Sequence, residues 1–567
     1  MDIDPSKLTP MGQLNLKNYM EGKAVLEKLE EMTKDPMRYN TEVLMKILRD
    51  NKDTEYGRKY GFADIHSIEE YQKRVPITMY DDYAGYIYRM TEEGKTDLIT
   101  SYHVGHYAKS SGTMGNPKRI PVSDESVAIL DRYNQQVRTA IQCEALGLGW
   151  IEPPVINLIE APMTTLKNGA TYGAISGRIV LSLGEHLKLF MTSPQEALVP
   201  DPKTNTRYLH ARFALMNRDV TMVVCSYISL TLEIMQYIEK EWRMLVRDIE
   251  EGTIDESVKM PDDVRRSLEA KVEPMPERAA ELRAIFEKGF DEPVMPRIWP
   301  NMVVIVGIST GGFADYLRRL KEKYAGEGFR YLFPGVTASE GLFTNPLAMD
   351  DVNAIVVPDS MFYEFIPVDT GDPADIVTMD KLEVGRLYEI VATNFSGFYR
   401  YRMRDALKVT GMHNSTPLME FQYRIDQCLD MTGEKTTEVA LREALERTER
   451  SLGFDVIDFS AYPDASGDPL RYVYLLEPDG MPEELTREEI AEELNRNLCD
   501  TNPQYGYKFE KGIFGRLDVK YVQPETYLLY RDLAISKGTA SSQLKPPHIL
   551  NNEMQRRFFL ALLEEGQ

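Results

Sequence analysis

The sequence predicts an α/β protein: a large N-terminal domain of mixed α/β structure with substantial sheets, followed by a small α+β domain. Two observations support this. Short β-rich runs alternate with helix-like stretches over about the first 420 residues, and the pattern changes after about Arg424. We therefore expect residues 1–425 to form the large domain and residues 426–567 the small one. A chain of 567 residues is long enough for both cores.

Helical spacing of apolar residues predicts two amphipathic helices in the large domain. Residues 15–34 place apolar side chains three and four apart and end before Asp35-Pro36. The stronger case is residues 230–251, where one apolar stripe lies opposite charged side chains. We interpret that stripe as core packing and not as a ligand site.

Strands of the large domain are predicted from runs rich in β-branched and aromatic residues. A helix-like stretch at residues 314–323 separates the first run from the second. The predicted strands are residues 302–308, 354–358, 387–392 and 407–411.

The small domain is predicted to begin with a helix at residues 437–451. A hairpin-like pair follows, at residues 456–462 and 470–477. A further helix is opened by Thr486-x-x-Glu489, which has the spacing of a capping box.

Charge and cysteine usage exclude several classes of function. Lys and Arg total 66 against 89 Asp and Glu, and the net charge of −23 disfavours nucleic acid and anionic membranes as partners. The four cysteines are far apart and form no C-x-x-C pair, which is typical of reduced thiols. No window approaches 18 uncharged apolar residues, and the first residues carry no apolar stretch. We expect a cytoplasmic protein; its oligomeric state is left open.

The most informative segment is S-S-G-T-M-G-N-P-K at residues 110–118. Its glycines let backbone N–H groups turn toward an anion, its hydroxyls can donate to phosphate oxygens, and its lysine supplies a cation. It is neither a Walker A loop nor a G-x-G-x-x-G motif. On the residues alone, it is either a surface turn or a phosphate-binding loop. The candidate phosphate ligands are Ser110, Ser111, Gly112, Thr113, Gly115 and Lys118.

This segment resembles the phosphate loop of the adenylate-forming superfamily, which includes acyl-CoA synthetases, luciferases and peptide-synthetase adenylation domains. The superfamily binds ATP and joins its α-phosphate to a carboxylate. Further motifs of the superfamily follow in the same order: V-T-A-S-E-G at residues 336–341, Y-R-Y-R-M-R-D at residues 399–405, Arg424, and a lysine at position 545.

The resemblance implies a role for each of these residues, with ATP and Mg²⁺ as cofactors. Glu340 would hold Mg²⁺, Asp405 would bind the ribose hydroxyls, and Lys545 would bridge the reacting carboxylate and the α-phosphate. Thr113, Glu340 and Lys545 are the candidate catalytic residues. The other nucleotide-binding candidates are Val336, at the adenine position, Ser339, and Arg424 on the hinge side, where a structural salt bridge is the alternative.

Longer stretches are similar to one branch, the Gretchen-Hagen-3 auxin-responsive family of acyl acid amido synthetases. They include N-x-x-T-E-Y-G-R-K-Y-G-F from residue 51, I-W-P at residues 298–300, E-F-I-P at residues 364–367 and F-Y-R-Y-R at residues 398–402. The likeness spans about residues 30–550. It implies a mobile small domain and a two-step reaction, in which the acid is first adenylated and its acyl group is then transferred to the amine of an amino acid.

The same resemblance indicates an acyl site. Tyr172 is expected to form an aromatic wall of the acid pocket, and His106 to line its entrance, although an ordinary hydrogen-bonded histidine is the alternative. Four residues depart from the family pattern. Met114 replaces a loop serine, Ala338 replaces a serine of the plant motif, and Arg404 replaces a glycine. Val336 replaces the aromatic residue that stacks on adenine, with Phe333 or Phe343 as substitutes.

Two other functions remain open. A ligase that ends in a CoA thioester shares the first half-reaction. A non-catalytic protein that binds an acid or a nucleotide would keep the fold without turnover. The identities of the acid, the amine and the general base are not fixed by these motifs.

Overall fold

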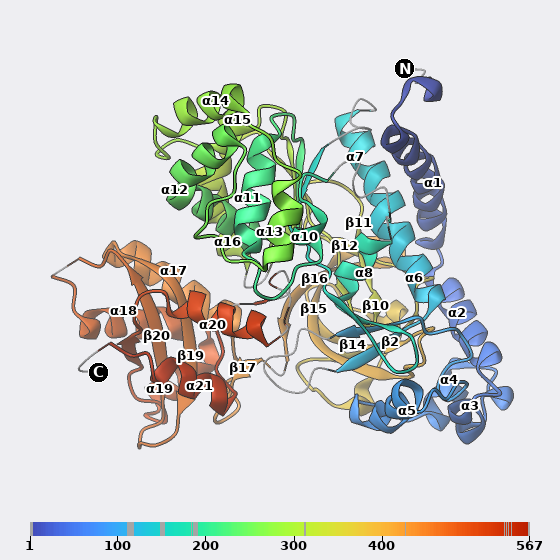
Figure 1. The fold of residues 1–567 in the computed structure, drawn as a ribbon. Helices are drawn as coiled ribbons and strands as arrows, with labels where there is room; N and C mark the ends of the chain where they lie inside the picture. The colour runs from blue at the N-terminus through green and yellow to red at the C-terminus, as the bar shows by residue number, and fades with distance from the viewer. Residues whose placement is uncertain are drawn as a thin grey trace. The chain divides into compact units, whose positions relative to one another are not determined.

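The computed structural model describes residues 4–109, 118–147, 154–182, 184, 191–310, 313–425, 427–482, 484–537, 539, 541, 544–545 and 547–564. The chain forms two compact units. The large unit comprises Met1–Met403 and Leu407–Phe421, and the small unit comprises Arg404–Ala406 and Gln422–Gln567. Both contain helices and sheets, which confirms the predicted mixed α/β class (Figure 1).

The large unit begins with helices. Helix α1 (Pro10–Met32) starts earlier than predicted, because Thr9 caps it by accepting from the Gly12 N–H and Pro10 suits the first helical position. It packs along the continuous helical stretch formed by α6, a π-helical turn and α7 (Figure 1). The remaining N-terminal helices are α2 (Pro36–Asp50), α3 (Glu55–Tyr60), α4 (Ile68–Arg74) and α5 (Asp81–Glu92); the stretch beside α1 is α6 (Asp124–Asp131), Arg132–Val137 and α7 (Arg138–Leu146).

One sheet of the large unit is entirely parallel and buried. Its order is β3-β6-β7-β8, with bounds Val155–Asn157, Met222–Tyr227, Val304–Ile308 and Arg330–Leu332. Its strands are nearly continuous apolar runs, as expected where both faces are covered. The predicted helix at residues 230–251 is α12 (Ile228–Glu251), whose apolar stripe lies in the core as predicted. Other helices of this region are α11 (Thr206–Met216), α14 (Pro276–Phe286) and α16 (Ala314–Leu320).

A second sheet, β2-β1-β5-β4, carries the segments predicted to bind substrate. Strands β1 (His106–Lys109) and β2 (Arg119–Val122) are antiparallel, with Lys109 opposite Arg119. Strand β5 (Thr171–Gly173) pairs with β1 in parallel and with β4 (Met163–Thr165) in antiparallel fashion. The residues predicted to hold phosphate therefore join two neighbouring strands.

The third sheet has six strands and the order β11-β12-β16-β15-β14-β13. It is held by buried ion pairs as well as by apolar packing: Arg400 pairs with Glu364, and Arg402 with Glu389. The strands are β11 (Thr344–Pro346), β12 (Ala354–Val356), β13 (Phe362–Pro367), β14 (Leu387–Thr393), β15 (Tyr401–His413) and β16 (Thr416–Arg424).

The small unit has a three-stranded sheet, β19-β20-β21, and its own hydrophobic core. The predicted hairpin is confirmed as β19 (Asp455–Asp464) paired with β20 (Arg471–Asp479), and β21 (Asp518–Tyr521) adds in parallel. Helix α17 (Glu438–Leu452) packs on α18 (Arg487–Thr501), and the capping box of Thr486 and Glu489 is present. The other helices are α19 (Pro503–Glu510), α20 (Thr526–Ser536) and α21 (Glu553–Leu560).

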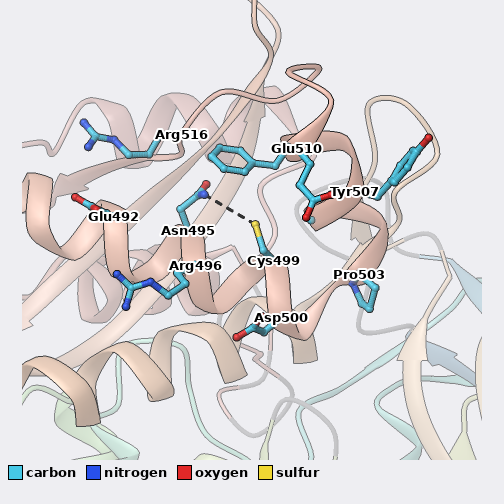
Figure 2. Close-up of a pocket in the computed structure, with 11 residues that line it drawn as sticks. Glu492, Asn495, Arg496, Cys499, Asp500, Pro503, Tyr507, Glu510 and Arg516 are labelled. Carbon is cyan, nitrogen blue, oxygen red and sulfur yellow. Dashed lines mark hydrogen bonds between the residues drawn. The ribbon is translucent and has the colours of Figure 1, made fainter.

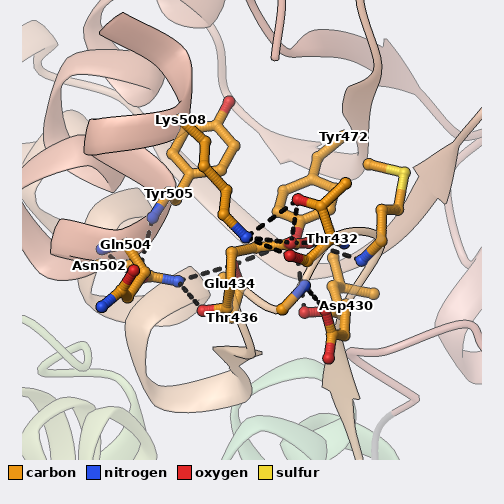
Figure 3. A network of polar contacts seen from close by, with 12 residues as sticks. Asp430, Thr432, Glu434, Thr436, Tyr472, Asn502, Gln504, Tyr505 and Lys508 are labelled. Carbon is orange, nitrogen blue, oxygen red and sulfur yellow. Dashed lines mark hydrogen bonds and ion pairs between the residues drawn. The ribbon is translucent and has the colours of Figure 1, made fainter. Parts of the chain in front are cut away.

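A buried carboxylate fixes the loop near the start of the small unit. Glu434 accepts hydrogen bonds from the backbone N–H groups of Met431 and Thr432 and from the hydroxyl of Tyr472 (Figure 3). Lys508 lies 3.6 Å from it and donates to the Thr432 carbonyl. Burial raises the pKa of Glu434, but these hydrogen bonds outweigh burial, so the pKa is lowered and the carboxylate stays ionised.

All four cysteines, Cys143, Cys225, Cys428 and Cys499, are free thiols, as predicted. Of the helices that the structure describes, none combines the length and the hydropathy needed to cross a bilayer.

Candidate active site

The predicted phosphate ligands Ser110, Ser111, Gly112, Thr113 and Gly115 lie outside the described residues, as does Met114. The residues on either side of this segment belong to paired strands. Lys109 at the end of β1 lies opposite Arg119 at the start of β2. Lys118 lies over the ring of Tyr80, with its Nζ 5.2 Å from the centroid. The hydroxyl of Tyr80 accepts from the backbone N–H of Arg119 at 2.9 Å. The cation predicted to face phosphate is therefore held at the base of this segment.

His106 is buried at the start of β1, with 1% of its surface exposed. Its Nδ1 lies 2.8 Å from the hydroxyl of Thr171, which is 3.3 Å from the Gly105 carbonyl and donates to it. This network assigns the proton to Nδ1 and leaves a lone pair on Nε2. Burial first, and the charge of Arg178 second, lower the pKa of His106 to about 4. The ring is thus a neutral hydrogen-bond acceptor, and Nε2 has no partner among the described residues.

Tyr172 is half-buried on β5 and lies opposite Tyr107 of β1, whereas His106 lies opposite Thr171. The guanidinium of Arg119 lies 5.9 Å from its ring centroid. Tyr172 and Val336 both pack against the same hydrophobic cluster of the large unit. The residue predicted to line the acid pocket and the residue predicted to contact the adenine therefore pack against the same hydrophobic core.

The motif at residues 336–341 forms a tight hairpin. Strands β9 (Thr337–Ala338) and β10 (Gly341–Leu342) are antiparallel with Gly341 opposite Ala338, so Ser339 and Glu340 form the two-residue turn. Gly341 has a φ of 145°, a conformation that favours glycine. The side chain of Asn394 donates to the Glu340 carbonyl at 2.8 Å. The predicted metal ligand therefore lies on a turn that is braced from outside.

The neighbourhood of this hairpin explains how Val336 is held. Its N–H donates to the Thr344 hydroxyl at 2.7 Å, and its carbonyl accepts from Phe343 at 2.9 Å. Phe343 is only 1% exposed, whereas Phe333 is half-buried. Of the two aromatic substitutes predicted for the adenine site, Phe333 is the more accessible. Helix α6 contacts both β10 and α8 (Ile175–Leu181), the helix after Tyr172.

Asp405 and Arg424 form an ion pair in the small unit. The Arg424 Nε lies 3.0 Å from the Asp405 Oδ1, and the carboxylate is 8% exposed. The residue before this aspartate, Arg404, has a φ of 60°, in the left-handed region that glycine adopts most easily. The backbone at Arg404 is thus one that the glycine expected from the resemblance would adopt easily.

Lys545 is exposed on the segment of the small unit that precedes His548. Its charge contributes to lowering the pKa of Glu438, the first residue of α17, although burial opposes that shift. The lysine therefore lies within electrostatic reach of this carboxylate. Sequence reasoning did not identify Glu438, because nothing in its pattern distinguishes it from other acidic residues at the start of a helix.

A cavity of about 780 Å³ opens elsewhere in the small unit, along α18 and α19 (Figure 2). Charges of both signs line it, among them Arg496, Asp500 and Glu510. Burial raises the pKa of its thiol, Cys499, to about 11, so the thiol is protonated at neutral pH. No residue predicted for catalysis lines this cavity, and we do not assign the active site to it.

No group of three or more His, Cys, Asp or Glu side chains in the described ranges is placed to hold a metal ion. This does not conflict with a Mg²⁺ role for Glu340, because Mg²⁺ is commonly bound by one or two carboxylates together with substrate phosphates and water. A single carboxylate on a braced turn fits such a site.

Comparison with known proteins identifies the class. The fold resembles that of a 2-hydroxyisobutyryl-CoA ligase bound to 2-HIB-AMP, with a TM-score of 0.54, 12% identity and coverage of 93% of this chain and 91% of that one. It matches a GH3.15 acyl acid amido synthetase more fully, with a TM-score of 0.83, 26% identity and coverage of 95% and 96%. The architecture is that of the adenylate-forming ligases.

The family follows from the sequence. Residues 25–328 match the GH3 family N-terminal domain, residues 354–424 its central domain and residues 439–554 its C-terminal domain. The chain therefore belongs to the GH3 family, which confirms the resemblance stated from its motifs. It is 28% identical to a jasmonoyl-L-amino acid synthetase of Oryza sativa subsp. japonica, covering 93% of this chain and 94% of the relative. It is 26% identical to a 4-substituted benzoates-glutamate ligase of Arabidopsis thaliana, with coverage of 93% and 95%.

Proposed function

We propose that this protein is an ATP-dependent acyl acid amido synthetase. It adenylates a small carboxylic acid with release of pyrophosphate and then transfers the acyl group to the amine of an amino acid. The observation that carries this proposal is the match to all three GH3 domains in order across residues 25–554. The names of the relatives, which conjugate jasmonate or benzoates to amino acids, support the same two classes of substrate.

The first step forms a bond between a carboxylate oxygen and the α-phosphorus and breaks the bond to the β-phosphate oxygen. Lys118 and the segment at residues 110–117 would contact the phosphates, and the ammonium of Lys545 would offset charge between the carboxylate and the α-phosphate. Bound Mg²⁺, held by Glu340, would neutralise phosphate charge. Because Lys545 belongs to the small unit, the step requires that unit to bring the ammonium to the nucleotide.

The second step forms the amide. The amine nitrogen attacks the carbonyl carbon, AMP leaves with the bonding electron pair, and the nitrogen loses a proton. Asp405 would hold the ribose throughout, and the ring of Tyr172 would form a wall of the acid pocket. The buried Nε2 of His106, on the strand next to β5, would be free to accept a hydrogen bond.

A pyrophosphate-release screen over a panel of carboxylic acids with Mg-ATP tests the first step. Mass spectrometry of the product, with amino acids or CoA supplied in parallel, tests the second. We expect acid-dependent pyrophosphate and an amide. A thioester without an amide would replace this function by that of a CoA ligase, and nucleotide binding without any pyrophosphate would indicate a non-catalytic binding protein. The K545A variant should lose pyrophosphate release, while K511A, at an exposed lysine of the same unit, should keep it.

A further inference from the structure

A buried histidine in the small unit lies between two carboxylates. The His548 Nδ1 is 2.6 Å from the Glu438 Oε1, and its Nε2 is 2.8 Å from the Asp458 Oδ1. Its side chain is 1% exposed, and its ring stacks on Phe459 with centroids 4.7 Å apart and an angle of 8°. These contacts fix the ring in position and in orientation.

The partners indicate a protonated ring. A carboxylate only accepts hydrogen bonds, so both ring nitrogens must carry a proton to bond to Glu438 and Asp458. The guanidinium of Arg442 opposes this, because its Nη2 lies 2.7 Å from the His548 Nε2 and 3.9 Å from Asp458. With a neutral ring, however, two carboxylates would face a single guanidinium in a buried place, whereas an imidazolium balances the charge.

The direction of the pKa shift of His548 agrees with this balance of charges. Burial and Arg442 lower the pKa of His548, but Asp458 and Glu438 together outweigh them, and the pKa lies above its usual 6.5. The charged groups facing the ring are Glu438 and Arg442 from α17 and Asp458 from β19. Lys545, on the ring's own segment, acts on Glu438.

The backbone on either side of the ring is attached to β19. The hydroxyl of Ser460 donates to the Pro547 carbonyl at 2.7 Å, and the N–H of Ala461 donates to the His548 carbonyl at 2.7 Å. The N–H of Leu550 returns to the Ala461 carbonyl at 2.9 Å. The segment that carries Lys545 is therefore held on the sheet from Pro547 onward.

We propose that His548 is a positioning residue for Lys545: its ring, held by Glu438 and Asp458, fixes the lysine-bearing segment against α17 and β19. This rests on the proposed role of Lys545 in adenylation. Glu438 is shared, since it bonds to the ring and also feels the charge of the lysine. Loss of the ring's second proton leaves the two carboxylates repelling each other, and the segment loses its fixed place.

The test compares H548Q, H548R and wild type in the full-length enzyme by pyrophosphate release. A lysine that is present but poorly placed lowers kcat more than it changes the KM for ATP. We expect H548Q to lose roughly tenfold or more in kcat with an ATP KM within about twofold. We expect the wild-type rate to fall at high pH as the ring loses its second proton. H548R restores a cation that does not titrate, so it should recover part of the rate and show no such fall.

Three outcomes separate this proposal from the proposed function. If K545A releases pyrophosphate like wild type, the role of Lys545 fails and His548 has nothing to position. If K545A is inactive while H548Q keeps the wild-type kcat and pH profile, the positioning role is overturned. If H548Q does not fold, as judged by thermal unfolding, E438Q replaces it, because it keeps the shape of the side chain and removes one of the two charges. An unchanged kcat and pH profile in E438Q would also overturn the proposal.

Discussion

The Nε of Arg424 lies 3.0 Å from the Oδ1 of Asp405, so the carboxylate predicted to bind ribose is itself paired with the arginine predicted for the hinge side. The two predicted nucleotide-binding residues thus form one ion pair. The pair orients the aspartate through its Oδ1 atom.

Replacing Asp405 by Asn should weaken nucleotide binding, because the amide keeps the size of the carboxylate but loses its charge and one of the two oxygens that would accept hydrogen bonds from the ribose hydroxyls. We expect the KM for ATP to rise about tenfold or more, while the KM for the acid changes little. Steady-state pyrophosphate release with each substrate varied in turn measures both. An equal rise in the two constants would contradict a ribose role for Asp405.

Replacing Glu340 by Gln should raise the Mg²⁺ concentration needed for half-maximal activity by about tenfold, because a neutral amide is a poorer ligand for a hard cation. A Mg²⁺ titration of pyrophosphate release is the measurement. E383Q, at an exposed glutamate of the large unit that pairs with Arg386, is the matched control and should behave as wild type. An unchanged midpoint in E340Q would rule out the metal role.

Acid should destabilise the large unit through His106. Its pKa is about 4 in the folded protein and 6.5 in the reference state, so between these values the unfolded chain binds more protons. The contribution of His106 to the free energy of unfolding is therefore fully present above pH 6.5. It is lost as the pH drops toward 4, by about 3 kcal/mol in all. Urea unfolding between pH 7.5 and 5 measures the effect. H106N should reduce the dependence, and burial of His210, whose pKa is also lowered to about 4, accounts for a similar remaining part. H66Q, at an exposed histidine, should leave the dependence unchanged.

The E-F-I-P motif should act on stability and not on substrate binding. Glu364, which is 0% exposed, forms two hydrogen bonds of 2.9 Å with Arg400 and a third with Gln72. E364Q leaves the arginine buried without its counter-charge and should cost about 3 to 5 kcal/mol. Denaturant unfolding measures the loss. A large change in the KM for either substrate in the folded variant would instead indicate a role in binding.

Local periodicity predicted much of the fold. The helix at residues 230–251 and the hairpin of the small unit were found because their apolar positions repeat with the period of the element. Strand β15 is longer than predicted, since Arg402 pairs with Glu389 in the sheet and a charged residue hides the alternation. Strand β2 was missed, because four residues that include Pro121 carry no β pattern.

The candidate site was predicted through motif order, which locates residues such as Glu340 and Asp405 but not their supports. Asn394 braces the Glu340 turn from 54 positions away in the sequence. The partners of His548 are equally remote, since Glu438 and Asp458 lie 110 and 90 residues from it. Such pairings exist only after folding, and no local pattern contains them.

Arg404 shows that a left-handed backbone conformation can be present without the glycine that adopts it most easily. Its φ of 60° is one that glycine would adopt freely, and here an arginine adopts it. Either residue can therefore stand before Asp405 without a change in the backbone path of β15, the strand that contains this aspartate. A motif search that insists on glycine at this point would pass over chains with arginine there, whereas one that asks for the left-handed conformation would find them.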